Sequence, residues 1–403
     1  MTNKKEQKDT LLTILSKSAI LLINFAIVVF TTRFWGAEGK GYIAIFTANL
    51  GLISIVTNIF TNSSISYFVR KIGASKLYAQ ACLWIFISSS LGVLICYIID
   101  HNSYLFLLLI ASVLTGYLTF HNALYIGMQK IKYFNLITIL QPLFLLIFMN
   151  LFYYLTKTSY FDYFYAHIIS FIIVIIISLF LTRKTVGKIK MQLDFAVTKQ
   201  TFNYGFQNEL SSFLQFFVCR LCYYFIIYYL GERSLGIFSV GIAISESTWI
   251  VCRSISMIQY SKIIKEGNTK NARKGVVRSS FISVIATSVS VLIILLLPKS
   301  IFAQIFGNEF SEVKQIVLLM SPGILSIAFS NIYGHFFAAI GKLKILILKS
   351  LVGVIITVPL SIVLIPLWKM EGACIANSIV HFTCSAIIVF YFIVVKNKNL
   401  SND

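Results

Sequence analysis

Long apolar stretches separated by short polar breaks run through nearly all of this 403-residue sequence. A hydrocarbon core about 30 Å thick takes about 20 apolar residues for each helical crossing. We count twelve such stretches, near residues 11–35, 42–69, 77–99, 103–128, 133–155, 163–182, 204–229, 236–260, 277–297, 314–340, 343–365 and 372–395. They are apolar on every face, whereas the strands of a membrane barrel alternate apolar and polar residues. The sequence therefore predicts an all-α polytopic membrane protein.

The first apolar stretch follows a basic start and so imitates a secretory signal peptide. It is about 25 residues long, and no small-x-small cleavage site precedes Gly36. We expect it to be retained as the first membrane helix.

The basic residues predict the orientation, because cytoplasmic loops carry an excess of Lys and Arg. When the breaks are assigned alternately to two sides, one side holds 24 Lys and Arg and the other holds six. The basic side comprises both termini and the loops 70–76, 129–132, 183–203, 262–278 and 342–349. We therefore expect both termini in the cytoplasm.

The formal charge of +20 is spread over these short loops, so it indicates topology and not a nucleic-acid partner. The seven cysteines lie in apolar stretches, and the CRLC spacing of Cys219 and Cys222 has no second Cys pair or histidine cluster beside it. We interpret them as buried packing residues and expect no metal. No nucleophile elbow, HExxH motif or pair of membrane carboxylates suggests an enzyme.

A short glycine-rich segment occurs twice. FWGAEGKGYIAIF (34–46) and LGERSLGIFSVGIA (230–243) place Gly36 and Gly41 at the same separation as Gly231 and Gly236, 195 residues apart. A phosphate-binding loop would need Lys and Ser or Thr after its last glycine, whereas Gly41 is followed by Tyr42. We therefore expect two turns between consecutive helices.

A second pair of similar segments is YIGMQKIKYF and AAIGKLKILI, at an offset of 214 residues between Gly127 and Gly341. Each half then holds six helices. An even number preserves orientation, so the two lobes are expected to be related by a pseudo-twofold axis along the membrane normal. We divide the chain into an N-terminal lobe (1–182), a basic connector at the cytoplasmic interface (183–203) and a C-terminal lobe (204–403).

These features resemble the Wzx-type O-antigen and polysaccharide flippases of the multidrug/oligosaccharidyl-lipid/polysaccharide (MOP) exporter superfamily. The resemblance rests on the two halves of six predicted helices each, the G-x-x-x-x-G turns, the loops at Gly127/Lys130 and Gly341/Lys344, and the segment EGACIANSIVH (371–381). The last segment is similar to the Gly-Ala-Ala-x-Ala entry of that family's final helix, with Cys374 in place of the second alanine.

The resemblance implies a transporter of the bacterial inner membrane that acts in lipopolysaccharide or capsule synthesis. Its substrate would be an undecaprenyl-pyrophosphate-linked oligosaccharide, moved from the cytoplasmic to the periplasmic leaflet by alternating access. Its partners would be this lipid-linked oligosaccharide, the bilayer, and a polysaccharide polymerase with its chain-length regulator. No cofactor is implied, and coupling to protons or sodium stays open.

Charges inside membrane stretches are functional candidates because they are costly there without water or a partner. At 1.5 Å per residue, Arg220 and Glu246 lie at matching depths, and so do Glu209 and Arg253. One interpretation is that the two charges within each pair only neutralise each other. The other is that Arg220 and Arg253 line a cavity and bind a pyrophosphate or an acidic sugar, with Glu209 and Glu246 as ion-pair or coupling carboxylates.

Other candidates are less specific. Lys17 and Arg33 of the first helix are either cavity cations or side chains that reach the membrane surface. Four asparagines could contact sugar hydroxyls or bond between helices: Asn24, Asn49, Asn58 and Asn62. Three histidines are weaker candidates for proton coupling: His121, His335 and His381.

The main alternative is a multidrug or cation antiporter of the same superfamily. Such a protein would carry carboxylates in its membrane core, whereas the first six stretches have none in their interiors. A sugar-polymerising enzyme or ligase usually has a large outer loop, but the longest outer break here has about sixteen residues. A peptidoglycan-precursor flippase usually has fourteen helices.

Overall fold

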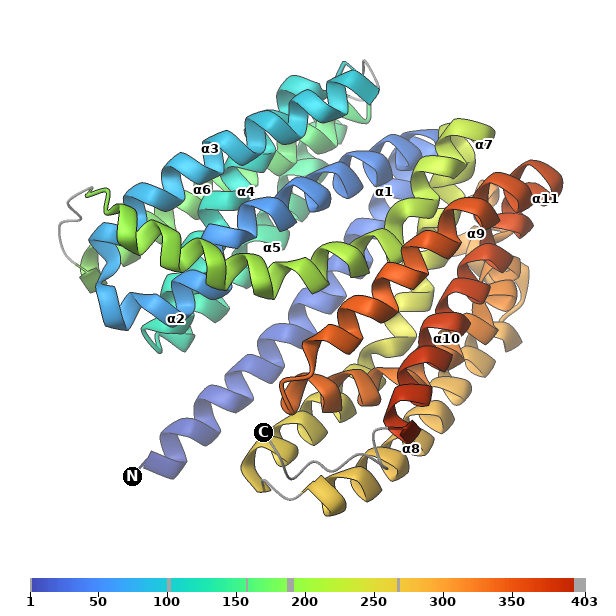
Figure 1. Cartoon of the computed structure of the whole chain (residues 1–403). Helices are drawn as coiled ribbons and strands as arrows, with labels where there is room; N and C mark the ends of the chain where they lie inside the picture. Colours follow the sequence, from blue (N-terminus) through green and yellow to red (C-terminus); the bar gives the residue numbers. More distant parts are fainter. Residues whose placement is uncertain (1, 100–102, 157–158, 187–191, 267–268, 395–403) are drawn as a thin grey trace. The chain divides into compact units, whose positions relative to one another are not determined.

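The computed structural model describes residues 2–99, 103–156, 159–186, 192–266 and 269–394 (Figure 1). Within these ranges it contains eleven α-helices and one short 3₁₀ helix, and no strand. Nine of these helices are long and apolar enough to cross a membrane. Three of the nine contain a break, at Gly36, Gly231 and Trp368–Lys369. Counting each of these three as two crossings gives twelve, so the predicted fold class is confirmed.

The broken helices are α1 (Thr2–Thr61), α7 (Phe195–Glu266) and α11 (Leu343–Val394). The other elements are α2 (Ser63–Ile72), α3 (Ala74–Ile99), α4 (Leu105–Gly127), α5 (Ile131–Thr156), α6 (Phe161–Val186), α8 (Thr269–Leu296), α9 (Lys299–Phe306), η1 (Asn308–Phe310) and α10 (Val313–Ala339).

The breaks in α1 and α7 explain the repeated glycines. Gly36 has φ 62° and ψ −164°, and Gly231 has φ 78° and ψ 179°. A residue with a side chain is strained at such positive φ values, whereas glycine adopts them freely. Both segments are therefore turns, as the sequence predicts, and not phosphate-binding loops.

The second apolar stretch is interrupted, although the sequence predicts one crossing over 42–69. The helix stops at Thr61, and Asn62 adopts φ −116° and ψ −102° before α2 begins. The side chain of Asn62 makes no capping bond to α2. Its amide instead donates to Glu209 Oε1 at 3.1 Å, which is a contact that the apolar pattern does not reveal.

The chain forms two compact units, whose bounds differ from the expected lobes. The first unit contains residues 1–35 and 42–213, and the second contains 36–41 and 214–403. The turn 36–41 thus packs with the second unit, while the first nineteen residues of α7 pack with the first. The change of unit therefore falls inside α7, between Phe213 and Leu214, and not in the connector.

In the first unit, α4 packs against α2, α3, α5 and α6. Its core lies in two places. One cluster joins α2, α3 and α4 through residues such as Phe68, Leu77 and Phe120. The other joins α4, α5 and α6 and includes Ile137 and Val174.

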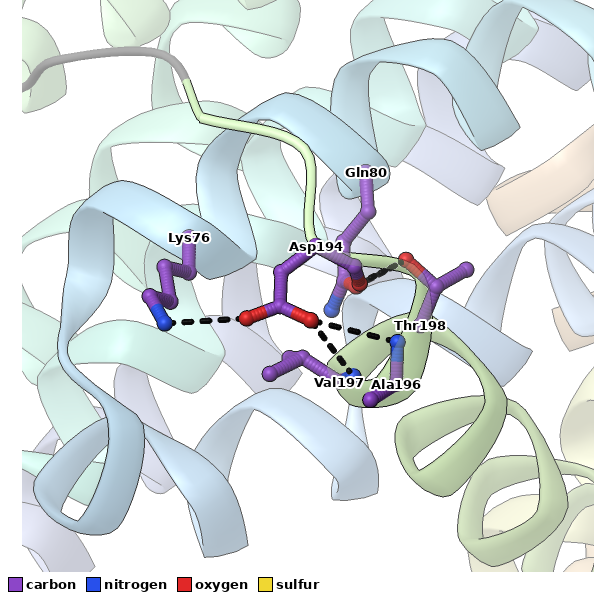
Figure 2. Close-up of polar contacts among 6 residues, drawn as sticks. All are labelled: Lys76, Gln80, Asp194, Ala196, Val197 and Thr198. Atoms are coloured by element: carbon purple, nitrogen blue, oxygen red, sulfur yellow. Dashed lines mark hydrogen bonds and ion pairs between the residues drawn. The ribbon is translucent and has the colours of Figure 1, made fainter.

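The start of α7 is fixed within the first unit by a small polar cluster (Figure 2). Asp194 Oδ1 accepts bonds from the backbone amides of Ala196 and Val197, at 3.1 and 3.3 Å, and so caps the helix. Asp194 Oδ2 accepts from Lys76 Nζ of α3 at 2.9 Å. One helical turn later, Thr198 Oγ1 donates to Gln80 Oε1 at 2.9 Å. The helix therefore starts on α3, which explains why its first turns belong to the first unit.

In the second unit, α10 packs against α8 and α11. Its largest core cluster includes Ile332, Phe336 and Phe392. The two glycine turns also meet within this unit. A Cβ atom added to Gly236 would overlap the carbonyl oxygen of Ala37, and one added to Gly41 would overlap the carbonyl oxygen of Glu232. At an offset of 195 these contacts are equivalent, so the repeats approach each other reciprocally and only glycine fits at either position.

The two segments of the second similar pair end their helices in the same way, but at another offset. The amide of Lys130 bonds to the carbonyl of Tyr125 at 2.8 Å, and that of Lys342 bonds to Phe337 at 2.9 Å. Gln129 (φ 57°) and Gly341 (φ 73°) occupy the left-handed position of these two helix ends. The offset is therefore 212 and not 214. Gly127 has a different role, because a Cβ there would crowd Val69 and the backbone of Ser66.

Candidate functional site

An ion pair lies within the membrane-spanning part of the second unit. Arg220 Nη1 is 2.8 Å from Glu246 Oε1, and the two side chains are 25% and 29% exposed. Both residues belong to α7, one on each side of its break at Gly231. The pair therefore joins two antiparallel crossings, as their matched depths predict. Arg220 also stands over the ring of Tyr223, with its Cζ 5.2 Å from the centroid.

A small cavity adjoins this pair. Its volume of about 10 Å³ is room for about one water molecule. The wall is formed by residues from α7, α10 and α11: Cys219, Arg220, Ile242, Ser245, Glu246, Trp249, Met320, Asn377 and His381.

Three polar atoms in this wall have no hydrogen-bond partner among the residues that the structure describes. They are Ser245 Oγ, Trp249 Nε1 and Asn377 Oδ1, in side chains of residues that are 1%, 6% and 4% exposed. A buried polar atom without a partner is destabilising by about 1–3 kcal/mol. Such a group of unpaired donors and acceptors beside an ion pair is suited to a polar ligand or a water molecule.

The polar contacts continue from the cavity along α7. Gln215 Nε2 lies 3.3 Å from Cys219 Sγ. Gln215 Oε1 accepts from Lys349 Nζ at 3.0 Å and from Ser350 Oγ at 3.3 Å, both from α11. We call Lys349, Gln215, Cys219, Arg220 and Glu246 the polar row. It carries two cations and one carboxylate.

Sequence reasoning missed Lys349 as a site candidate. It counted Lys349 among the basic residues of the loop 342–349, whereas α11 begins at Leu343 and includes this residue. The sequence did indicate that Lys349 lies within a helix, because it directly follows the apolar run ILIL. Ser245, Trp249 and Asn377 were also missed, since single polar residues in apolar helices are common.

The second expected pair, between Glu209 and Arg253, is not placed by the structure because these residues belong to different units. Glu209 is 7% exposed and accepts from Asn62 within the first unit. Arg253 is exposed, and its Cζ lies 6.0 Å from the centroid of the Trp249 ring. Arg253 therefore lies beside Trp249, a residue of the cavity wall, and forms no ion pair among the described residues.

The remaining candidates lie in the first unit. Lys17, Asn24 and Arg33 are exposed on α1. Asn49 Nδ2 is 3.4 Å from Tyr104 Oη, and Asn58 Oδ1 accepts from Thr61 Oγ1 at 3.4 Å. Asn49, Asn58 and Asn62 thus bond within the protein, which favours the packing interpretation for these three.

The three histidines lie apart. His121 Nδ1 is 3.0 Å from Thr182 Oγ1 in the first unit. In the second unit, His335 packs against Tyr260 with 6.0 Å between ring centroids. His381 lines the cavity, and its ring lies 6.1 Å from that of Trp249. Of the three, His381 alone therefore adjoins the polar row.

Solved structures with a similar fold are membrane transporters. An inward-facing multidrug resistance MATE family transporter of the MOP superfamily matches with a TM-score of 0.71 and 13% identity, over 96% of this chain and 100% of that chain. The MATE multidrug transporter DinF-BH, solved as a complex with a bound compound, matches with a TM-score of 0.71 and 14% identity, over 97% and 95% of the two chains. The chain therefore has the MOP superfamily fold.

A third match is another transporter of this superfamily. It is a MOP superfamily transporter from Pyrococcus furiosus, described as having a binding pocket of reverse polarity that suggests a different function. Its TM-score is 0.65 at 14% identity, over 96% of this chain and 94% of that chain. Identities this low support the fold alone.

No family model matches the sequence. Among curated proteins, the capsular polysaccharide biosynthesis protein CapF of Staphylococcus aureus is 27% identical over 165 residues. The match spans 40% of this chain and 41% of CapF.

Proposed function

We propose that this chain is a membrane transporter that moves an undecaprenyl-pyrophosphate-linked oligosaccharide from the inner to the outer leaflet of a bacterial inner membrane. The oligosaccharide would be an O-antigen or capsule repeat unit. The fold is one that transporters use, and the partial similarity to CapF supports a role in polysaccharide synthesis.

One observation carries the choice of substrate. The polar row of the second unit holds Arg220 and Lys349 against the single carboxylate of Glu246. A net positive charge within a membrane-spanning region favours an anionic ligand, and the forked guanidinium of Arg220 suits a phosphate or carboxylate. In the resting protein Glu246 satisfies Arg220, and a bound diphosphate takes the place of Glu246 as its partner.

Exchange of partners gives a simple mechanism. A dianionic diphosphate outcompetes one carboxylate for Arg220 because it offers more acceptor oxygens. The released carboxylate of Glu246 then needs water or a proton. Until the substrate leaves, this unpaired group raises the free energy of the site. Alternating access of the two units would expose the site to one leaflet after the other.

The experiment that tests this function removes the gene from its native host and leaves the glycosyltransferases intact. A membrane-impermeant reagent then labels glycans on intact and on lysed spheroplasts. We expect lipid-linked saccharide that is labelled only after lysis, with normal labelling when the gene is restored. Unchanged labelling of intact spheroplasts would contradict the proposal.

A multidrug or cation exporter is the second candidate, and Glu209 favours it. This buried carboxylate makes no ion pair among the residues that the structure describes, and it accepts a hydrogen bond from the neutral amide of Asn62. A cation could bind there. In that case Glu209→Gln would abolish the efflux of a cationic dye, whereas Arg220→Gln would leave it unchanged.

A further inference from the structure

We infer that Lys349 is a second cation of the substrate site and binds the diphosphate together with Arg220. This inference rests on the proposed function and extends it, because it names the residue that distinguishes a diphosphate from a single phosphate. Lys349 belongs to α11 and Arg220 to α7, and both lie in the second unit.

The ammonium of Lys349 bonds to a neighbouring helix. It lies six residues after Leu343, so about 9 Å of helix separates it from the start of α11. A lysine so placed can extend its side chain to the membrane surface. Its ammonium instead donates to Gln215 of α7 at 3.0 Å. The charge is thus held within α11, which is long and apolar enough to cross a membrane.

The charge of Lys349 is not compensated by a carboxylate. Three ion pairs occur among the described residues, and none includes Lys349. Its oxygen partner is the neutral side chain of Gln215, which leaves two of the three ammonium donors for a ligand. Arg220, in contrast, is already paired with Glu246. Lys349 is therefore the cation that can meet an anion without first displacing a carboxylate.

A purely structural role does not need this charge. Ser350, the next residue of α11, bonds to the same oxygen of Gln215 at 3.3 Å, so a neutral group already links the two helices there. A membrane-embedded ammonium is costly by several kcal/mol unless water or a partner offsets the loss of hydration. A lysine at this position is therefore better explained by ligand binding than by helix packing.

The two cations are associated with the same short stretch of α7. Gln215, which holds Lys349, lies five residues before Arg220 on α7, which is about 7.5 Å along the helix. Cys219 lies between them and connects Gln215 to the wall of the cavity. In the inferred site one phosphoryl group would be bound by Lys349 and the other by Arg220, whereas a monophosphate would be bound by one of the two cations.

The test measures the binding of three short probes to the purified full-length protein: farnesyl diphosphate, farnesyl monophosphate and farnesol. We expect the wild type to prefer the diphosphate. Lys349→Gln should weaken diphosphate binding by about tenfold, the equivalent of one charge-assisted hydrogen bond, and so reduce the preference for the diphosphate over the monophosphate. Arg220→Gln should reduce the same preference, because either variant leaves one cation, and Lys349→Arg should retain it.

Lys344→Gln is the matched control, because Lys344 lies on the same helix and is exposed near its start. If Lys349→Gln does not fold, Lys349→Met keeps the length of the side chain without its charge. An unchanged preference in the folded variant would overturn the inference and leave the proposed function standing. A wild-type protein that binds neither phosphate better than farnesol would contradict the proposed function itself.

Discussion

At the scale of single residues, the charged side chains of the membrane-spanning helices differ in how well their partners can be predicted. The pairing of Arg220 with Glu246 could be predicted, because helix rise alone places both at one depth on consecutive crossings. The role of Lys349 could not. An apolar pattern does not tell whether a basic residue near the start of a stretch points to the surface or inward to Gln215.

Exchanging the partners of the ion pair separates its two roles. In the double variant Arg220→Glu, Glu246→Arg, the pair can form again, so we expect thermal stability within about 1 kcal/mol of the wild type, since both side chains are partly exposed. The cation has moved, so transport of the lipid-linked oligosaccharide should fall by at least about tenfold. Full transport by the exchanged pair would show that Arg220 serves only to neutralise Glu246.

At the scale of elements, the periodic apolar pattern predicts the crossings well and their ends poorly. The glycine turns at 36–41 and 231–236 were predictable because both turn chemistry and repetition point to them. The interruption at Asn62 was not, since it depends on a tertiary bond to Glu209. The pairing of the helix ends near Gln129 and Gly341 was misaligned by two residues, because the sequence pairs glycines and the backbone pairs left-handed positions.

The reciprocal glycine contact predicts a strong effect of one methyl group. In Gly236→Ala, the Cβ would overlap the backbone carbonyl of Ala37, which cannot rotate away. We expect a loss of about 2 kcal/mol or more in stability, at the level of an overpacked core, measured as a lower unfolding temperature. Gly334→Ala is the control, because its Cβ would lie 3.6 Å from the nearest atom. Equal unfolding temperatures for the two variants would refute the close contact.

The stability of the small polar cluster at the start of α7 (Figure 2) should depend on pH. The ammonium of Lys76, bonded to Asp194, together with the capping amides, lowers the pKa of the Asp194 carboxyl below its usual value. Since the folded-state pKa is depressed, the stabilisation is complete above about pH 4 and is lost as the pH falls further. Hydrogen-exchange protection of the Ala196 and Val197 amides should therefore drop as the pH falls below about pH 4. In Asp194→Asn it should start lower and stay constant; a pH-dependent drop in that variant would exclude Asp194 as the titrating group.

At the scale of the whole molecule, the number of crossings and the internal repeat were predictable, because they follow from length, hydropathy and glycine spacing. The bounds of the two units were not. They depend on which neighbours the turn 36–41 and the first turns of α7 pack against, and these contacts involve glycine backbones and single polar side chains. The predicted cytoplasmic location of both termini rests on the distribution of basic residues alone.

As a transporter, the protein is proposed to carry an anionic lipid-linked oligosaccharide across a membrane. The most direct measurement reconstitutes the purified full chain in vesicles that contain a diphosphate-linked oligosaccharide with a fluorescent glycan, and follows the fraction accessible to an impermeant quencher. We predict that wild-type vesicles expose the inner pool within the assay, while Arg220→Gln vesicles and protein-free vesicles retain it. Retention of the inner pool by wild-type vesicles that do transport a cationic dye would contradict the proposed function.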